Sequence, residues 1–140
     1  MNNFTIISDE VKSAIAKKDP IVALESTIIS HGMPFPQNEQ TALEVEDIVR
    51  SNGVTPATVA VIKGKLKVGL NRSEIKDLST KPGIIKMSKS NLYTGILRNQ
   101  TGSTTVAATL IACKFLGLEF FATGGIGGVH RNIEELDISA

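Results

Sequence analysis

Residues 21–62 read IVALESTIISHGMPFPQNEQTALEVEDIVRSNGVTPATVAVI, and this stretch places one helical pattern between two apolar runs. The runs at 21–24 and 57–62 are short and rich in β-branched residues, as buried strands are. Apolar residues recur at helical spacing over 40–51, and Gly53 then supplies a left-handed stop. A strand, a helix and a second strand in this order predict a β–α–β unit with a parallel sheet.

The alternation of helices and strands continues on both sides of this stretch. Ser8, followed by two acidic residues and an apolar periodicity, predicts a capped first helix. The other elements that we expect are a hairpin strand at 66–68, a helix at 73–78, a strand at 83–87, a helix at 104–116 and a strand at 119–122. The fold class is therefore α/β, and we expect a three-layer α/β/α domain with a mostly parallel central sheet that is incomplete in these 140 residues.

Two of these helices have apolar faces that we expect to be buried. In the helix at 40–51 this face consists of Ala42, Val45, Ile48 and Val49. In the helix at 104–116 it consists of Val106, Ala107, Leu110, Ile111 and Phe115. Residues spaced three and four apart lie on one side of a helix, so each set should pack against the sheet.

Composition limits the classes of partner. Fifteen Lys and Arg residues against fourteen Asp and Glu residues leave a net charge of +1, so we expect neither nucleic acid nor a membrane as a partner. The single cysteine, Cys113, has apolar neighbours, which favours a buried inert thiol over a nucleophile and is compatible with a reducing compartment. No signal-peptide pattern and no apolar run of about 20 residues is found, so a cytoplasmic location is expected.

Catalytic and binding residues of parallel sheets lie at the carboxyl ends of strands, and Glu25 directly follows the strand at 21–24. A carboxyl group among apolar residues has a raised pKa, which suits a general acid near neutral pH. A structural role in capping backbone amides is the alternative for Glu25. His31, in the loop that follows, is either a proton carrier or a hydrogen-bonding strut.

Two further strand ends collect polar residues. Lys86 closes the strand at 83–87, where it needs an anion or a path to water, so either a phosphate contact or an exposed edge position is expected. Residues 101–105, TGSTT, open the helix at 104–116 and are either an anion site or a simple N-cap.

The fourth candidate place is the glycine-rich loop TGGIGGVHR at 123–131. It fails the G-x-G-x-x-G dinucleotide pattern, because His130 stands where the last glycine would be. Its glycines still allow sharp bends or close approach of a ligand. Thr123 and His130 are candidate substrate-binding residues, and a solvated loop edge is the alternative. No zinc-site or P-loop pattern is found.

Five strings of this chain together resemble one family. They are VALESTIISHGMPFPQN at 22–38, ATVAVI followed by LKVGL, TTVAAT at 104–109, FATGGIGGVHR at 121–131 and the closing DISA. In order and spacing they are similar to the pseudouridine-5'-phosphate glycosidases, also called indigoidine-synthase-A-like proteins. The resemblance covers the chain from about Ser8 onward and implies that residues 1–140 are the amino-terminal part of a single glycosidase domain.

The resemblance implies an activity and site residues. Family members reversibly cleave pseudouridine 5'-phosphate to uracil and ribose 5-phosphate, through a Schiff base between a lysine and the sugar. The family's proton-donating glutamate falls on Glu25. Its substrate-contacting positions fall on Lys86 and on Val106, beside Thr105.

A metal site and an oligomer are implied in the same way. The aspartate believed to hold a manganese ion falls on Asp137, and Ser139 and Ala140 match the start of a substrate-binding turn. Without the resemblance, a turn residue would be the simpler interpretation of Asp137. The family also implies a homotrimer.

The chain departs from the family pattern in two respects. Residues 131–136 are one residue shorter than the family pattern and lack a second histidine, and the Schiff-base lysine lies beyond residue 140. We therefore expect a member of the glycosidase family whose 140 residues do not cleave the C–C bond by themselves. A phosphosugar-binding remnant or companion subunit, and a non-functional fragment with exposed apolar surface, are the alternatives.

Overall fold

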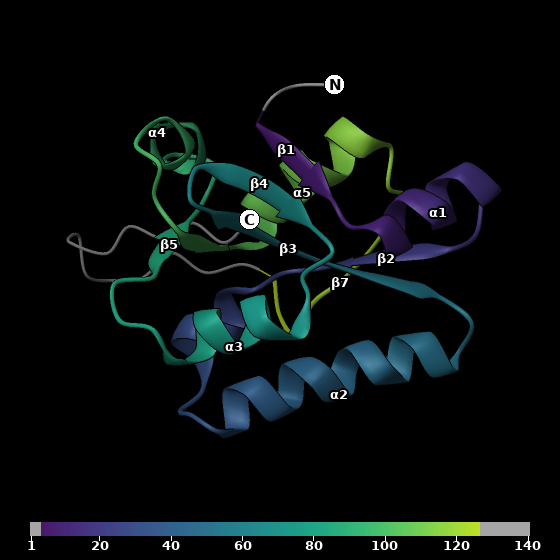
Figure 1. Ribbon diagram of the computed structural model, residues 1–140, viewed down its shortest axis with the longest axis horizontal. Coiled ribbons are helices and arrows are strands. Elements are labelled where there is room, and N and C mark those ends of the chain that lie inside the picture. Colours follow the sequence, from purple (N-terminus) through teal and green to yellow (C-terminus); the bar gives the residue numbers. More distant parts are fainter. Residues whose placement is uncertain (1–3, 127–140) are drawn as a thin grey trace.

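The computed structural model describes residues 4–126, which form the expected three-layer α/β/α domain with a mixed central sheet (Figure 1). The strands are β1 Thr5–Ile7, β2 Ile21–Leu24, β3 Thr55–Ile62, β4 Lys65–Val68, β5 Ile85–Met87, β6 Gly102–Thr104 and β7 Phe120–Ala122. The helices are α1 Asp9–Lys17, α2 Gln37–Ser51, α3 Arg72–Thr80, α4 Leu92–Leu97 and α5 Val106–Leu116, with a π-helical turn, η1, at Ile28–Gly32.

The sheet is built around β3 and is mostly parallel, as expected. β1 pairs with β4, β2 with β3 and with β7, and β5 with β6, all in parallel. β3 pairs in antiparallel register with β4, through the predicted hairpin, and with β6. The helices lie on the two faces of this sheet, with α2 and α3 together on one side (Figure 1).

Alternate residues of β3 supply the two hydrophobic cores. Val59 and Val61 face a cluster that includes Val11 of α1 and Ala112 of α5. Ala60, between them, faces a second cluster with side chains of α3. Successive side chains of a strand point to opposite faces of a sheet, so a fully buried strand needs apolar residues at every position.

Local signals in the sequence set most element boundaries. Ser8 caps α1 by accepting a hydrogen bond from the Val11 amide at 3.2 Å. Gly117 ends α5 in the left-handed conformation with φ of 67°. Gly64, with φ of +69°, closes the turn between β3 and β4, where a Cβ atom would lie 2.7 Å from the Ile96 carbonyl oxygen. These positions need only neighbouring residues to be recognised.

The expectation that residues 101–105 open a helix is wrong. Gly102–Thr104 form strand β6, and Thr105 is the N-cap of a helix that begins at Val106. Gly102 passes so close to β5 that a Cβ atom would lie 2.5 Å from the Ile85 carbonyl oxygen. Pairing with β3 and β5 therefore overrides the local helix-start signal.

Three other elements differ from the sequence-based expectation. Strand β1 and helix α4 have no predicted counterpart, and α2 begins at Gln37 rather than at residue 40.

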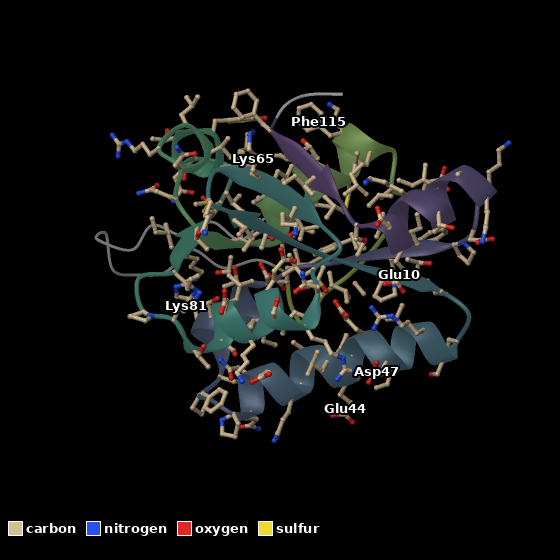
Figure 2. All side chains as sticks on the ribbon, viewed as in Figure 1. Glu10, Glu44, Asp47, Lys65, Lys81 and Phe115 are labelled. Atoms are coloured by element: carbon tan, nitrogen blue, oxygen red, sulfur yellow. The ribbon has the colours of Figure 1, made fainter. Side chains whose placement is uncertain are left out.

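The expected apolar faces of α2 and α5 are partly wrong, although Ala42 of α2 and Ile111 of α5 pack against the core as expected. In α2, Val45 and Ile48 are exposed, and Asn38 and Glu46 are buried instead. In α5 the buried residues are Val106, Ala108, Thr109, Ala112 and Cys113, whereas Leu110 and Phe115 are exposed. Figure 2 shows Phe115 at the outer surface of α5. Which side of a helix meets the sheet depends on the docking angle, which apolar spacing alone does not determine.

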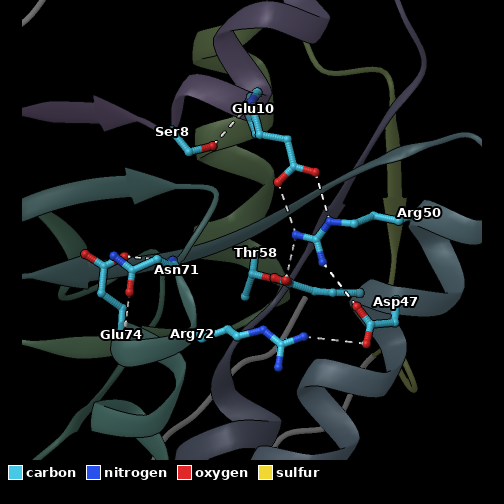
Figure 3. Close-up of polar contacts among 10 residues, drawn as sticks. Ser8, Glu10, Asp47, Arg50, Thr58, Asn71, Arg72 and Glu74 are labelled. Atoms are coloured by element: carbon cyan, nitrogen blue, oxygen red, sulfur yellow. Dashed lines mark hydrogen bonds and ion pairs between the residues drawn. The ribbon is translucent and has the colours of Figure 1, made fainter.

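A polar network joins α1, α2 and β3 (Figure 3). The Arg50 guanidinium donates to both carboxylate oxygens of Glu10, at 2.9 and 3.1 Å, and to Glu46 at 3.1 Å. Buried Glu46 also accepts a hydrogen bond of 2.5 Å from the Thr58 hydroxyl. The hydrogen bond to Glu10 is the main reason that the pKa of Arg50 is raised. Charge-assisted contacts thus hold α2 against the sheet.

Candidate functional site

Strands β2 and β6 meet end to end along one edge of β3. β2 runs parallel to β3 beside Thr55–Thr58, and β6 approaches from the opposite direction beside Ala60 and Val61. Where they meet, the hydroxyls of Ser26 and Thr104 both donate to the Val59 carbonyl oxygen, at 2.6 and 2.7 Å. The carboxyl ends of the two strands therefore converge on one point of the sheet.

The neighbouring strands bring two more carboxyl ends to the same point. β7 lies parallel to β2, and β5 lies parallel to β6. Four strands thus end at one junction, in the arrangement that forms a ligand crevice in open α/β sheets. We call this place the strand-end junction, and its centre is the Ser26–Thr104 pair.

The Ser26–Thr104 pair is buried and fully hydrogen-bonded. The Thr104 amide donates to the Ser26 hydroxyl at 2.9 Å, and the Ser26 amide donates to the Thr104 carbonyl at 3.2 Å. Both side chains are enclosed. Because every polar group has a partner, this contact is rigid and positions the residues on either side of it. Sequence reasoning missed Ser26, since its partner lies 78 residues away.

On one side of the junction, Glu25 and Thr123 come together. Glu25 directly follows β2, as expected, is half-buried, and its carboxylate accepts a hydrogen bond from the Thr123 hydroxyl. The same hydroxyl oxygen accepts a hydrogen bond from the Gly125 amide at 3.2 Å. The start of the glycine-rich loop is therefore tied to the candidate acid, although 98 residues separate Glu25 from Thr123.

Glu25 and Thr123 line a largely apolar cavity of about 290 Å³. Its other walls come from β2, η1, α2, β3 and β7, and they include Leu24, Ile28, Ile29, Thr41, Ala42, Val45, Thr58, Ala122 and Gly124. Apolar walls with a few polar groups are typical of small-molecule sites. A carboxyl group at such a wall has access both to a ligand and to a hydrogen-bond partner.

On the other side of the junction, Lys86 lies beside Ser103 in the sheet, and His31 lies within hydrogen-bond distance of Ser103. Lys86 of β5 is the register partner of Ser103 of β6, so the two side chains lie on the same face of the sheet. The Ser103 hydroxyl lies 3.2 Å from His31 Nδ1, which agrees with a strut role for His31 and does not test proton transfer. Lys86 lies at the edge of the described sheet, in a half-buried position.

Thr105 and Val106 lie at the start of α5, directly after β6. Thr105 is 1% exposed, and its side chain makes no capping hydrogen bond. The first turn of α5 contains no acidic residue. Amides in the first turn of a helix have no partner within the helix, so this N-terminus can accept an anion.

The structure does not bring every predicted site residue to the junction. His130, Asp137, Ser139 and Ala140 lie outside the described residues 4–126. Within that segment no three His, Cys, Asp or Glu side chains are grouped as metal ligands, so the described donors do not form a manganese site. Cys113 is buried in α5, as expected, and burial raises its thiol pKa.

The chain is similar in sequence to known proteins over nearly its whole length. A pseudouridine-5'-phosphate glycosidase of Caldanaerobacter subterraneus subsp. tengcongensis is 53% identical over 141 residues, which cover 100% of this chain and 46% of the relative. The pseudouridine-5'-phosphate glycosidase of Escherichia coli K12 is 53% identical over 136 residues, covering 96% of this chain and 44% of the relative. The chain therefore spans about half the length of the curated relatives it matches.

A solved structure has the same fold. The prealnumycin C-glycosynthase AlnA, in complex with ribulose 5-phosphate, superposes with a TM-score of 0.82 at 38% identity, covering 99% of this chain and 45% of that one. The family model described as indigoidine synthase A like protein matches residues 10–140. With nearly the whole sequence matched, the chain belongs to the indigoidine synthase A-like family.

Proposed function

We propose that the protein is the amino-terminal part of a pseudouridine-5'-phosphate glycosidase, which reversibly cleaves the C–C glycosidic bond to give uracil and ribose 5-phosphate. The observation that supports this most is the strand-end junction, where Glu25 and Thr123 lie on one side and Lys86 and Thr105 on the other. Two relatives with this name are 53% identical, and a neighbour of the same fold binds ribulose 5-phosphate.

Glu25 is the proposed proton donor. When the C–C bond breaks, its electron pair stays on the uracil carbon, which must then take up a proton. Glu25 lies at the wall of an apolar cavity, and its hydrogen bond from Thr123 orients the carboxyl group. The cavity is thus the proposed site of the base, with Glu25 at its polar end.

The start of α5 is the proposed phosphate subsite. Free first-turn amides, beginning at Val106, are donors for phosphate oxygens, and Lys86 on the adjacent strand adds a positive charge. The Schiff base to the sugar is formed by a lysine that the family resemblance implies beyond residue 140. Its hydrolysis by water releases ribose 5-phosphate. Without that lysine the 140 residues should show no turnover.

The remaining parts of the proposal rest on the resemblance. They are that residues 1–140 are part of one domain, that the enzyme is a cytoplasmic homotrimer, and that Asp137 with water molecules holds a manganese ion. The described residues do not form a manganese site, and the roles of Glu25 and Lys86 do not depend on the metal. In the described segment, no helix has the length and apolar character needed to cross a bilayer.

The decisive experiment is a fusion of residues 1–140 to the carboxyl-terminal half of the Caldanaerobacter relative, assayed for uracil release. We expect turnover, and Glu25→Gln should lower it by a factor of about 10² to 10⁴ because general acid catalysis is lost. Glu44→Gln, on the outer side of α2, is the matched control and should retain the activity. A folded fusion that is inactive, or that keeps its activity without Glu25, contradicts the proposal.

Phosphosugar binding without catalysis is the second candidate. It is supported by the start of α5, whose first turn has no acidic residue, and by Lys86 on the adjacent strand, because these groups can bind a phosphate without taking part in bond cleavage. Calorimetry of the 140-residue chain with ribose 5-phosphate distinguishes the two candidates. Binding by the chain, combined with an inactive fusion, would support binding alone.

A further inference from the structure

Two hydroxyls at the strand-end junction are buried without a hydrogen-bond partner. Within residues 4–126, Thr27 Oγ1 and Thr105 Oγ1 are the buried side-chain oxygen or nitrogen atoms in this state. Their neighbours differ: the hydroxyls of Ser26 and Thr104 both donate to a backbone carbonyl. Most buried hydroxyls are hydrogen-bonded, so a pair of exceptions at one place needs a physical reason.

The chain places these two threonines on either side of one contact. Thr27 follows Ser26, Thr105 follows Thr104, and Ser26 and Thr104 are joined by reciprocal backbone and side-chain hydrogen bonds. Each threonine also stands at the N-cap of the element that follows, η1 for Thr27 and α5 for Thr105, and neither side chain caps it. Both hydroxyls are therefore available to another group at the junction.

Internal packing does not explain why these positions carry hydroxyls. Valine has nearly the same shape as threonine and would avoid the cost of burying a polar group without a partner. A buried hydroxyl that has no acceptor within the protein is useful when a ligand supplies one. The Glu25 carboxylate accepts from Thr123 at the cavity on the other side of the junction. On the side of Thr105, the first-turn amides of α5 are donors and the Lys86 ammonium is positive, so the matching ligand group there is an acceptor with negative charge.

We propose that Thr27 is a ligand-binding residue and that the Thr27 and Thr105 hydroxyls donate hydrogen bonds to phosphate oxygens of a phosphorylated sugar. This inference rests on the proposed function and adds Thr27 to its phosphate subsite. Both hydroxyl oxygens are closed off from water, so the turn at Ile28–Gly32 that follows Thr27 must shift when a phosphorylated sugar enters. π-Helical turns of this kind occur often at functional sites.

The test compares Thr27→Val with the unmodified chain in thermal unfolding and in calorimetry with ribose 5-phosphate and with inorganic phosphate. The midpoint temperature of Thr27→Val should be equal to or above that of the unmodified chain, because no hydrogen bond is lost. Its affinity for ribose 5-phosphate should fall about tenfold or more, as expected for a hydrogen bond to a charged group. Thr27→Ser keeps the hydroxyl and should retain most of the affinity.

Thr104→Val is the matched control. Its hydroxyl donates to the Val59 carbonyl at 2.7 Å, so this variant should unfold at a lower temperature than the unmodified chain. If Thr27→Val is destabilised as strongly as Thr104→Val, the Thr27 hydroxyl has a structural role and the inference is overturned. Equal ribose 5-phosphate affinity of Thr27→Val and the unmodified chain also overturns it, while leaving the proposed function intact.

The two proposals fail in different ways. If the unmodified chain binds inorganic phosphate but not ribose 5-phosphate, and Thr27→Val binds neither, the anion subsite stands and the phosphosugar function fails. If the unmodified chain binds neither compound, both proposals are rejected.

Discussion

Helices α2 and α3 lie on the same face of the sheet, yet they bury opposite kinds of side chain (Figure 1). α3 packs through Ile75 and Leu78, which are fully enclosed in the core. α2 instead buries Asn38 and Glu46, and leaves Ile48 55% exposed. One helix therefore completes its apolar packing within the described residues, and the other does not.

Polar contacts explain how α2 stays in place. Asn38 donates from its side-chain amide to the carbonyls of Ile29, at 2.7 Å, and Ser79, at 3.0 Å. Glu46 accepts from Thr58 and Arg50 (Figure 3). Because these contacts are directional, they select the side of α2 that faces the sheet even though Val45 and Ile48 are exposed.

The contrast between α2 and α3 shows that the spacing of apolar residues identifies an apolar face of a helix but does not identify what packs against that face. The exposed Val45 of α2 lines the cavity beside Glu25, so part of this face belongs to the candidate site. Ile48 lies on the outer side, next to Leu43 and Asp47. The relatives are about twice as long as this chain, so we expect a further part of the family fold to cover the outer side.

The largest expected effect separates the two helices directly. Ile75→Ala in α3 should lower the free energy of unfolding by about 2–5 kcal/mol, because it removes methylene groups from a packed core. Ile48→Ala in α2, the same substitution at an exposed site, should change it by less than about 0.5 kcal/mol. Urea unfolding of both variants measures the difference. Equal losses would mean that α2 packs through its apolar face after all.

An intermediate effect is expected where α2 meets β3. Thr58→Val should lower the free energy of unfolding by about 1.5–3 kcal/mol, because buried Glu46 loses a charge-assisted hydrogen bond. Urea unfolding measures this loss. Thr94→Val, at an exposed position on α4, is the matched control and should have little effect. If Thr58→Val is as stable as the control, Thr58 does not help to hold α2.

The smallest effect on stability is expected from Ile48→Lys. Lysine should leave the free energy of unfolding within about 0.5 kcal/mol, since the side chain at this position is exposed. Removing an apolar group from the uncovered face should nevertheless reduce self-association of the 140-residue chain. Light scattering over a range of concentrations measures it. If Ile48→Lys changes neither the self-association nor the stability, the exposed face of α2 around Ile48 does not contribute to self-association.

The element boundaries were largely predictable because they depend on neighbours in the chain. The strand at 21–24 and the hairpin around Gly64 were found from short apolar runs and a glycine turn. The strand Gly102–Thr104 was not, because a run of small and hydroxyl residues has no strand signal of its own. It becomes a strand only by pairing with residues 60–61 and 85–87.

Glu25 illustrates the same division within the site. The sequence predicts its position after a buried strand and also predicts the loop that begins at Thr123. The hydrogen bond between Thr123 and Glu25 could not be predicted from the sequence, because the two residues are 98 positions apart. Thr27 had no signal at all, since an unpaired hydroxyl can be recognised only when all its neighbours in space are known.

The sequence by itself determined the β2–α2–β3 unit, the hairpin around Gly64, the caps at Ser8 and Gly117, and the family. These features follow from short-range sterics, from periodicity and from strings of residues that stand next to one another. Only the tertiary structure decided that β2 and β6 meet head-on at Val59 and that α2 docks through polar groups. These features depend on hydrogen bonds and packing between segments that are distant in the sequence, and a local sequence pattern does not identify which segments will be in contact.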